Sequence, residues 1–316
     1  MINPLNVTAR LPWEQDLKIV RADQSLPGIS VVIPIFNAGK FLEKTLRSLL
    51  CNDLTGCEII VMDGGSTDGT PQILEHYKHM FSVCVSERDD GQSDAINRGF
   101  ARATQPILYW LNGDDLVLPN VFTAVRKYYA DQPGVNVLVG NAFMTELDLT
   151  PIRHFVFSPE KLRFESLIDY ASNHLIQPSV FFSREAWEKS GPVKKELHYA
   201  MDADLFIDMS KNFSFHHFAS DLAYSVYHEE CKTRGKRAES ITELALIQAR
   251  HGGFQQAKKT LDILVGLYHQ VETSLQSSGS DEMCRKCSVL EGKLSALTAE
   301  YNQNVELALL ADIEIK

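Results

Sequence analysis

The sequence predicts an α/β fold, with a mostly parallel sheet flanked by helices and a helical hairpin at the C-terminal end. Three observations predict it. Short apolar runs alternate with segments of helical spacing over roughly the first 140 residues. Acidic clusters follow two of these runs, at the sheet edge where such folds place their ligands. A heptad-like spacing of apolar residues appears only in the last third of the chain.

The strand-like runs are short, rich in Val, Ile and Leu, and several end at proline or an acid, as expected of buried parallel strands. We expect strands at 29–34, 58–62, 81–85, 106–111 and 135–139. The segments between them space apolar residues by three and four, and one opens with Thr70-Pro71, which favours a helix start. The expected helices are 41–50, 70–79, 93–103 and 120–129.

The pattern loosens after residue 140, where strands and helices are less regularly spaced. We expect a hairpin or edge strands over 143–157 and a strand over 177–182. Short helices are expected at 185–189 and 201–209. The apolar stretch 213–227 is expected to close the sheet.

Composition shifts divide the chain into a leader at 1–28, a main α/β domain at 29–237 and a helical extension at 238–316. In the extension, helical spacing over 254–275 resumes over 290–309 after a Ser/Gly turn, which predicts a helical hairpin. A rival description is a helix–turn–helix around Gly252-Gly253. The apolar seams are expected to support a homodimer or docking onto a membrane-associated synthesis complex.

Bulk properties exclude several classes of protein. The net charge of −10 argues against a nucleic-acid partner, which would meet a basic face. No apolar run has the length of a transmembrane helix and the first residues show no secretory signal, so a cytoplasmic protein is expected, with the inner face of the membrane as the alternative. Six scattered cysteines fit a reducing compartment, and the lone Cys284-Arg285-Lys286-Cys287 lacks the second pair of a zinc site.

The two acidic clusters are the main functional signal. They lie at 63–68, which reads Asp-Gly-Gly-Ser-Thr-Asp, and at 112–115, which reads Asn-Gly-Asp-Asp. An acid pair at a strand end suits a divalent cation, and the cation in turn suits a diphosphate. The chain is therefore expected to bind a nucleotide-linked substrate through a metal. The structural alternatives are turn and helix-cap roles, which Asp68 in particular fits because Thr70-Pro71 follows.

Four segments in order, 32–37, 60–70, 94–99 and 112–115, resemble the inverting glycosyltransferases of family 2, which have the GT-A fold, a Rossmann-like mostly parallel sheet. The likeness covers about 29–237 and includes three later stretches that a subset of the family shares. These are Gln-Pro-Ser-Val-Phe-Phe at 177–182, Met-Asp-Ala-Asp-Leu at 201–205, and a His-x-x-x-Lys-Thr at 228–233.

The resemblance implies metal-dependent transfer of a sugar from a UDP- or dTDP-linked donor to a hydroxyl of a glycan or lipid-linked oligosaccharide, as in polysaccharide biosynthesis at the cell envelope. It implies Asp202 as catalytic base and Asp115 as ligand of Mg²⁺ or Mn²⁺. The positions that would contact the donor are Pro34, Ile35, Phe36, Asp63, Asp94, Arg98, Asp114, His228 and Lys232. Two departures stand out: Gly64 replaces a second acid that some members carry, and Asn112 replaces the first acid of the usual Asp-x-Asp motif.

Several alternatives stay open at this point. Asp204 competes with Asp202 for the role of base, since both open the same helix. Asp94 could only cap a helix, and His228 could be structural. At the level of function, a nucleotidyltransferase would want a glycine-rich basic loop after the first strand, which 34–37 is not. A non-catalytic GT-A-like subunit that acts through its helical extension is the second alternative.

Overall fold

A computed structural model describes residues 11, 13 and 17–277 of the 316-residue chain. The chain forms two compact units, Met1–Gly235 and Lys236–Lys316. Half of the expected leader, and the helix expected over 290–309, lie outside the described residues. Within the described part of the chain, no helix combines the length and hydropathy that a bilayer span requires.

The first half of unit 1 forms a parallel sheet in the order β3-β2-β1-β4. Its strands are β1 (Ile29–Ile35), β2 (Cys57–Asp63), β3 (Val83–Ser86) and β4 (Ile107–Trp110). β1 lies at the centre and is buried along its whole length, as its continuous apolar run predicts. Because all four strands run the same way, their carboxyl ends and the loops that follow lie at one edge of the sheet.

The second half extends the same sheet with mixed pairing. β8 pairs antiparallel with β4 and β6, while β6 pairs parallel with the long strand β9. β5 and β7 complete the nine-stranded sheet of the described residues by antiparallel pairing with β9 and β6. The bounds of these strands are β5 (Leu116–Val117), β6 (Val137–Thr145), β7 (Pro151–Phe155), β8 (Val180–Ser183) and β9 (Phe215–Val226). The α/β class is thus confirmed. The expected strand over 135–139 and the start of the expected hairpin over 143–157 form one continuous strand, β6, which pairs with β7, β8 and β9, and the expected closing stretch forms β9.

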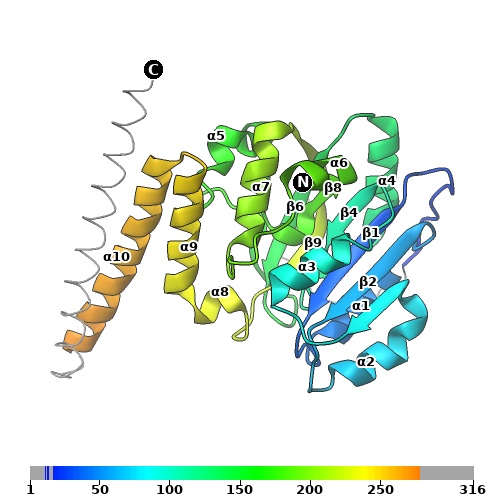
Figure 1. Ribbon diagram of the computed structural model, residues 1–316, viewed down its shortest axis with the longest axis horizontal. Helices are drawn as coiled ribbons and strands as arrows, with labels where there is room; N and C mark the ends of the chain where they lie inside the picture. Colours follow the sequence, from blue (N-terminus) through cyan, green and yellow to red (C-terminus); the bar gives the residue numbers. More distant parts are fainter. Residues whose placement is uncertain (1–10, 12, 14–16, 278–316) are drawn as a thin grey trace. The chain divides into compact units, whose positions relative to one another are not determined.

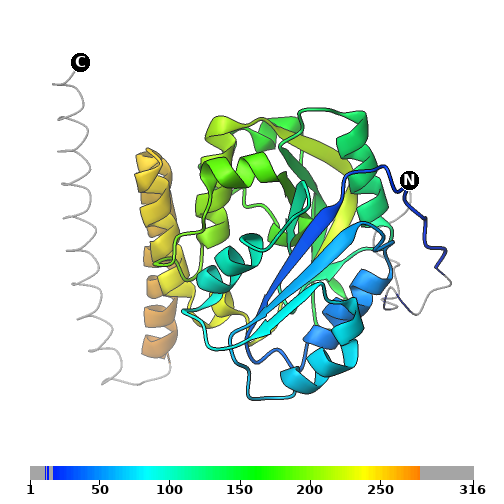
Figure 2. The ribbon, with the colours of Figure 1, turned by 45° about the vertical axis from the view of Figure 1, so that its right-hand side comes forward.

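Helices cover both sides of this sheet (Figure 1), and the turned view separates α3 from α1 and α2 (Figure 2). The alternate residues Ile29, Val31 and Ile33 of β1 belong to one core cluster with α1 (Leu42–Leu50), α2 (Thr70–Tyr77) and α4 (Val121–Asp131). Val32 faces the other way, toward α3 (Gln92–Phe100). There Gly99 permits a close approach, because a Cβ on it would lie 2.4 Å from Cγ1 of Val32.

Further helices follow the central strands. α6 (Arg184–Ser190) and α5 (Phe164–Leu167) both pack against α7 (Met201–Asn212), and a short α8 (Lys232–Gly235) ends unit 1. Two local expectations differ from the structure. The two-residue strand β5, directly after the second acidic cluster, was not predicted, and 177–179 form a 3₁₀ turn (Gln177–Ser179) before β8 because Pro178 cannot donate to a ladder.

Unit 2 is a helix–turn–helix over the described residues. α9 (Arg237–Arg250) and α10 (Phe254–Ser277) pack side by side, with the turn at Gly252, whose φ of 87° favours glycine. The helices are also joined by a hydrogen bond of 2.6 Å from the Thr260 hydroxyl to Oε1 of Gln248. The structure therefore shows the helix–turn–helix around Gly252-Gly253. The Ser/Gly turn and the second helix of the expected helical hairpin lie outside the described residues.

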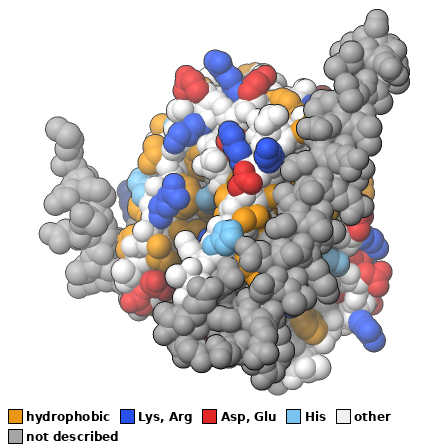
Figure 3. Space-filling view, turned by 90° about the vertical axis from the view of Figure 1, so that its left-hand side faces the viewer, with side chains coloured by type: hydrophobic (Ala, Val, Ile, Leu, Met, Phe, Trp, Pro, Cys, Tyr) orange, Lys and Arg blue, Asp and Glu red, His pale blue; other side chains and the backbone are white. Residues whose placement is uncertain are grey.

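The described surface carries charges of both signs. On the face shown in Figure 3, acidic and basic side chains are interspersed on the described surface.

Candidate active site

The loops after β1 and β2 lie side by side at the carboxyl edge of the sheet. Ile35 is the ladder partner of Asp63, and the Gly64 N–H donates to the Ile35 carbonyl at 2.9 Å. Two residues on, the Asn37 N–H donates to the Ser66 hydroxyl at 2.7 Å. Of the three residues of this loop that are expected to contact the donor, Pro34 and Ile35 are buried, whereas Phe36 is 65% exposed. Phe36 therefore presents a free aromatic side chain next to the Gly64 loop.

Asp63 organises its own loop. It is 2% exposed, and its carboxylate accepts hydrogen bonds from the Ser66 N–H and from the hydroxyls of Ser66 and Ser86, both at 2.5 Å. These bonds tie the end of β2 to the end of β3. A contact between Asp63 and the donor stays a prediction, and its oxygens are already engaged by the chain.

Asn112, which replaces the first acid of the Asp-x-Asp motif, lies at the centre of a hydrogen-bond network. Its Oδ1 accepts from Nε2 of Gln92 (3.0 Å) and Nε1 of Trp110 (2.8 Å). Its Nδ2 donates to Oδ2 of Asp115 and to Oε1 of Gln177, both at 3.1 Å. All four hydrogen-bonding positions of the amide are thus used, two as donor and two as acceptor. An aspartate here could not donate to Asp115 once ionised, which explains the departure from the Asp-x-Asp pattern.

Asn112→Asp is therefore expected to destabilise the fold in a pH-dependent way. Each of the carboxyls at 112 and 115 would raise the pKa of the other in the folded state, so stability is kept at low pH and lost as pH rises through the folded pKa. We expect a loss of about 3 kcal/mol at pH 8 and little loss at pH 5. Thermal melts at the two pH values measure it, with Gln72→Glu, exposed on α2, as a control for one added charge. Equal losses at both pH values would contradict this account.

Asp115 points into the protein. It is 5% exposed, and besides the bond from Asn112 its Oδ1 accepts from the Val226 N–H at 3.1 Å, which joins the second acidic cluster to β9. Burial, and then the charge of Asp114, raise the pKa of Asp115 to about 8. Both of its oxygens accept hydrogen bonds from donors of the chain, and the metal role expected of Asp115 stays a prediction.

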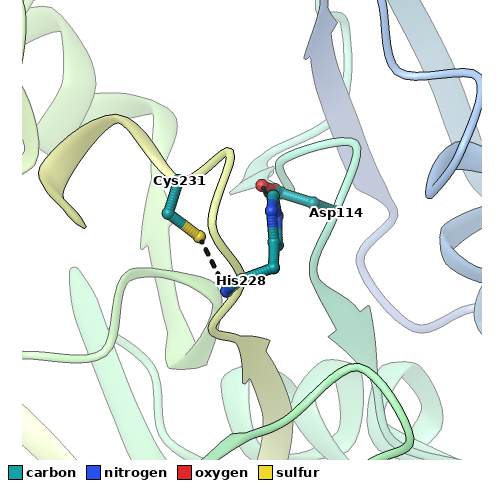
Figure 4. Close-up of side chains that lie close together, drawn as sticks. All are labelled: Asp114, His228 and Cys231. Atoms are coloured by element: carbon teal, nitrogen blue, oxygen red, sulfur yellow. Dashed lines mark hydrogen bonds and ion pairs between the residues drawn. The ribbon is translucent and has the colours of Figure 1, made fainter. Parts of the chain in front are cut away.

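Asp114 instead faces the late segment of unit 1. Nε2 of His228 lies 3.1 Å from Oδ2 of Asp114, and the His228 ring stacks on Phe41 with centroids 4.1 Å apart. The Sγ of Cys231 accepts from the His228 N–H at 3.3 Å (Figure 4). One ligand atom from each of Asp114, His228 and Cys231 lies within 4.8 Å of the others. Among the described residues this group has the spacing of a metal site.

The donor set fits a divalent cation. The Asp114 side chain is 33% exposed and is accessible to an ion from solvent. The His228 side chain is only 4% exposed, and its Nδ1 is buried without a hydrogen-bond partner. Carboxylate, imidazole and thiolate are the common ligands of Zn²⁺ in proteins, and carboxylate is also a common ligand of Mn²⁺. Sequence reasoning missed Cys231; its spacing of three from His228 was the available signal, and the turn that closes on it supplied the proximity.

Lys232 connects α8 to the same network. Its Nζ donates to Oε1 of Gln92 at 2.9 Å, and Gln92 in turn donates to Asn112. The structure thus brings the late motif at 228–233 to the second acidic cluster, as the resemblance implied. Gln92, at the start of α3, was not singled out from the sequence.

Asp94 and Arg98 lie in an ion-pair cluster on α3. Lys195 pairs with Asp94 at 2.6 Å and thereby lowers the pKa of that carboxyl. Arg98 lies 3.8 Å from Asp94 and pairs more closely with Glu87. Lys195 belongs to a stretch without any periodic pattern, so the sequence did not indicate it. The contacts of Asp94 and Arg98 with the donor remain predictions. Both side chains already form ion pairs within the chain.

Asp202 and Asp204 open α7 but differ in their surroundings. Asp204 has a side chain 7% exposed that pairs with Nζ of Lys194 at 2.7 Å. Asp202 is half-buried, and its Oδ2 accepts from the hydroxyl of the buried Tyr170 at 3.3 Å. Asp202 is therefore the more accessible of the two acids, and Asp204 fastens the preceding loop to the helix.

Comparisons with known proteins agree with this arrangement of fold and site. The family model described as glycosyl transferase family 2 matches residues 30–191. Among curated proteins, the putative teichuronic acid biosynthesis glycosyltransferase TuaG of Bacillus subtilis is 28% identical over 145 residues, 45% of this chain and 57% of TuaG. Glycosyltransferase GlyG of Streptococcus pneumoniae serotype 4 is 24% identical over 297 residues, 90% of this chain and 91% of GlyG. The chain thus spans less than two thirds of TuaG and nearly all of GlyG.

Solved structures share the fold at low identity. Residues 1–349 of S. aureus TarS in complex with UDP-GlcNAc give a TM-score of 0.57 at 18% identity, over 74% of this chain and 71% of that one. The mannosyltransferase PcManGT from Pyrobaculum calidifontis, in complex with GDP-Man and Mn²⁺, gives 0.54 at 15% identity, over 94% and 88%.

The match of the family model runs from β1 through α6 and covers just over half of the chain. It spans the parallel half of the sheet, both of its acidic loops and the ends of the strands from which they arise. The sequence resemblance is therefore confirmed: the chain belongs to glycosyl transferase family 2.

Proposed function

We propose that the protein is a metal-dependent inverting glycosyltransferase. It would transfer a sugar from a UDP- or dTDP-linked donor to a hydroxyl of a glycan or lipid-linked oligosaccharide. The observation that carries this proposal is the group formed by Asp114, which follows β4, and by His228 and Cys231, which follow β9. The complexes of TarS with UDP-GlcNAc and of PcManGT with GDP-Man and Mn²⁺ support the class of donor.

Asp114 and His228, rather than Asp115, would hold the cation in this proposal. A bound Mn²⁺ or Mg²⁺ would supply Lewis-acid stabilisation of the diphosphate as it leaves. The imidazole, and a thiol next to it, favour Mn²⁺ over the harder Mg²⁺, which prefers oxygen ligands. Lys232, held at Gln92, adds a positive charge on the same side of the network.

Asp202 would accept the proton of the acceptor hydroxyl. Inversion needs one base on the reacting face, and Asp202 is the less buried of the two acids: it is half-buried, whereas the Asp204 side chain is 7% exposed and pairs with Lys194. The Tyr170 hydroxyl, which donates to Oδ2 of Asp202, helps to fix the orientation of that carboxylate.

The direct test is a panel of sugar nucleotides with the full-length protein and Mn²⁺, with nucleotide release as the readout. The proposal expects release that requires the cation and that is limited to donors of one base class. Donor binding without any release or transfer to a glycan acceptor would favour the non-catalytic subunit that acts through its helical extension.

Cys231 provides a separate test of the composition of the metal group. In a background with Cys284→Ser and Cys287→Ser, Cd²⁺ is expected to give an ultraviolet sulfur-to-cadmium charge-transfer band, because Cd²⁺ is thiophilic. Cys231→Ser should remove the band, and Asp114→Asn should weaken Cd²⁺ binding. Cys84→Ser, at an exposed position on β3, is the matched control and should keep it. A band that persists in Cys231→Ser would exclude the thiol as a ligand.

A further inference from the structure

The carboxylate of Asp89 occupies the space next to Gly64. A Cβ built on Gly64 would lie 2.9 Å from Oδ2 of Asp89, 3.1 Å from its Oδ1 and 3.2 Å from its Cγ. Asp89 belongs to the loop between β3 and α3, twenty-five residues along the chain from Gly64. The acid thus stands where a side chain at position 64 would project, and glycine at 64 makes the room for it.

Asp89 is held in place yet keeps an acceptor available. Its Oδ1 accepts from the Gly91 N–H at 2.9 Å, which fixes the carboxylate in a turn before α3. Within the described residues, its Oδ2 accepts no hydrogen bond and makes no ion pair. Asp63, an acid expected to contact the donor, has both oxygens engaged by serines and is 2% exposed.

The surroundings of Gly64 are those expected for a nucleoside base. The Gly64 N–H bonds to the carbonyl of Ile35, which precedes the exposed ring of Phe36. An aromatic ring can stack on a flat heterocycle, and a fixed, partly buried acceptor beside it can accept a hydrogen bond from the edge of that heterocycle.

Resting on the proposed function, we propose that Asp89 selects the base of the donor nucleotide by accepting a hydrogen bond from an imino N–H. An ionised carboxylate accepts and does not donate. Uracil and thymine present N3–H to it, whereas cytosine and adenine present a ring nitrogen that is itself an acceptor. Guanine presents two adjacent donors, which suit both carboxylate oxygens, and Oδ1 of Asp89 is already used by Gly91. Uracil and thymine are therefore the favoured bases.

The test compares UDP and CDP binding to the full-length protein with Mn²⁺ by calorimetry. Wild type is expected to prefer UDP. In Asp89→Asn the amide oxygen can still accept from Gly91, while the NH₂ replaces Oδ2 and matches N3 of cytosine. The ratio of UDP to CDP affinity should fall about tenfold or more. Asp90→Asn removes the same charge from a neighbouring side chain that is 82% exposed, and should leave the ratio unchanged.

A second variant guards against misfolding of the first. Gly64→Asp combined with Asp89→Ala moves the carboxylate to the other side of the same space and should restore the preference for UDP that Asp89→Ala alone loses. An unchanged ratio in Asp89→Asn, or an equal change in Asp90→Asn, would overturn the inference. Binding by wild type without a preference for UDP over CDP would overturn it alone. Failure of wild type to bind any nucleotide would overturn the proposed function as well.

Discussion

Asp202→Asn is expected to lower the turnover number by about 10²–10⁴-fold, the usual contribution of a general base. The asparagine keeps the size of the side chain and can still accept from the Tyr170 hydroxyl, so the start of α7 should remain folded. Its amide cannot take the proton of an acceptor hydroxyl. Because Asp202 belongs to none of the loops that would hold the nucleotide, the affinity for the donor should change little. Steady-state transfer kinetics, with nucleotide binding measured separately, give the two quantities.

Asp204→Asn is the matched control for this prediction. It breaks the buried ion pair with Lys194, so the melting temperature should fall while the turnover number stays within a few-fold of wild type. The opposite pattern, with an active Asp202→Asn and a folded but inactive Asp204→Asn, would transfer the base to Asp204. That was the alternative that the sequence left open.

Asp114→Asn should weaken Mn²⁺ binding in the presence of UDP by about 10²-fold or more, since it removes the one exposed carboxylate of the metal group. His228→Ala should have a similar effect and should also loosen the contact with Phe41. Mn²⁺ binding is measured directly by electron paramagnetic resonance of the free ion, without reliance on turnover.

Asp115→Asn separates the two adjacent acids. Its amide group would oppose one of the donors, Asn112 or Val226, that now bond to the carboxylate, so a lower melting temperature is expected. Mn²⁺ affinity per folded molecule should be retained. If Asp115→Asn lost the ion while Asp114→Asn kept it, the ligand would be Asp115, as the sequence resemblance implied.

The parallel half of the fold was predictable because its signals are local. Apolar runs such as that of β1 are buried on both faces, and the loops that follow them carry glycine, proline and acids. The second half of the sheet was harder to predict, since β5 is two residues long and β9 pairs with strands far apart in sequence. Pairing of this kind depends on tertiary contacts that no short window contains.

The site residues also divide into those with a local sequence signal and those placed by tertiary contacts. The acidic loops and the motif at 228–233 were found from the sequence, and the structure brings Asp114 and His228 together. The turn between β4 and β5 determines whether Asp114 or Asp115 faces outward. The sequence alone therefore could not show which of these two adjacent acids would bind the metal. Cys231 and Asp89 reach their places by loop geometry; the spacing of Cys231 from His228 was a weak signal, and Asp89 lies in no pattern that would mark it.

The neutral side chain at position 112 has an energetic consequence for how the protein meets its substrate. With a carboxamide there and Asp115 turned inward, Asp114 is the one accessible carboxylate of the group, so a lone dication would find little compensating charge. A diphosphate brings the missing negative oxygens with it. Ion and nucleotide should accordingly bind with positive cooperativity, each raising the affinity for the other by the same factor.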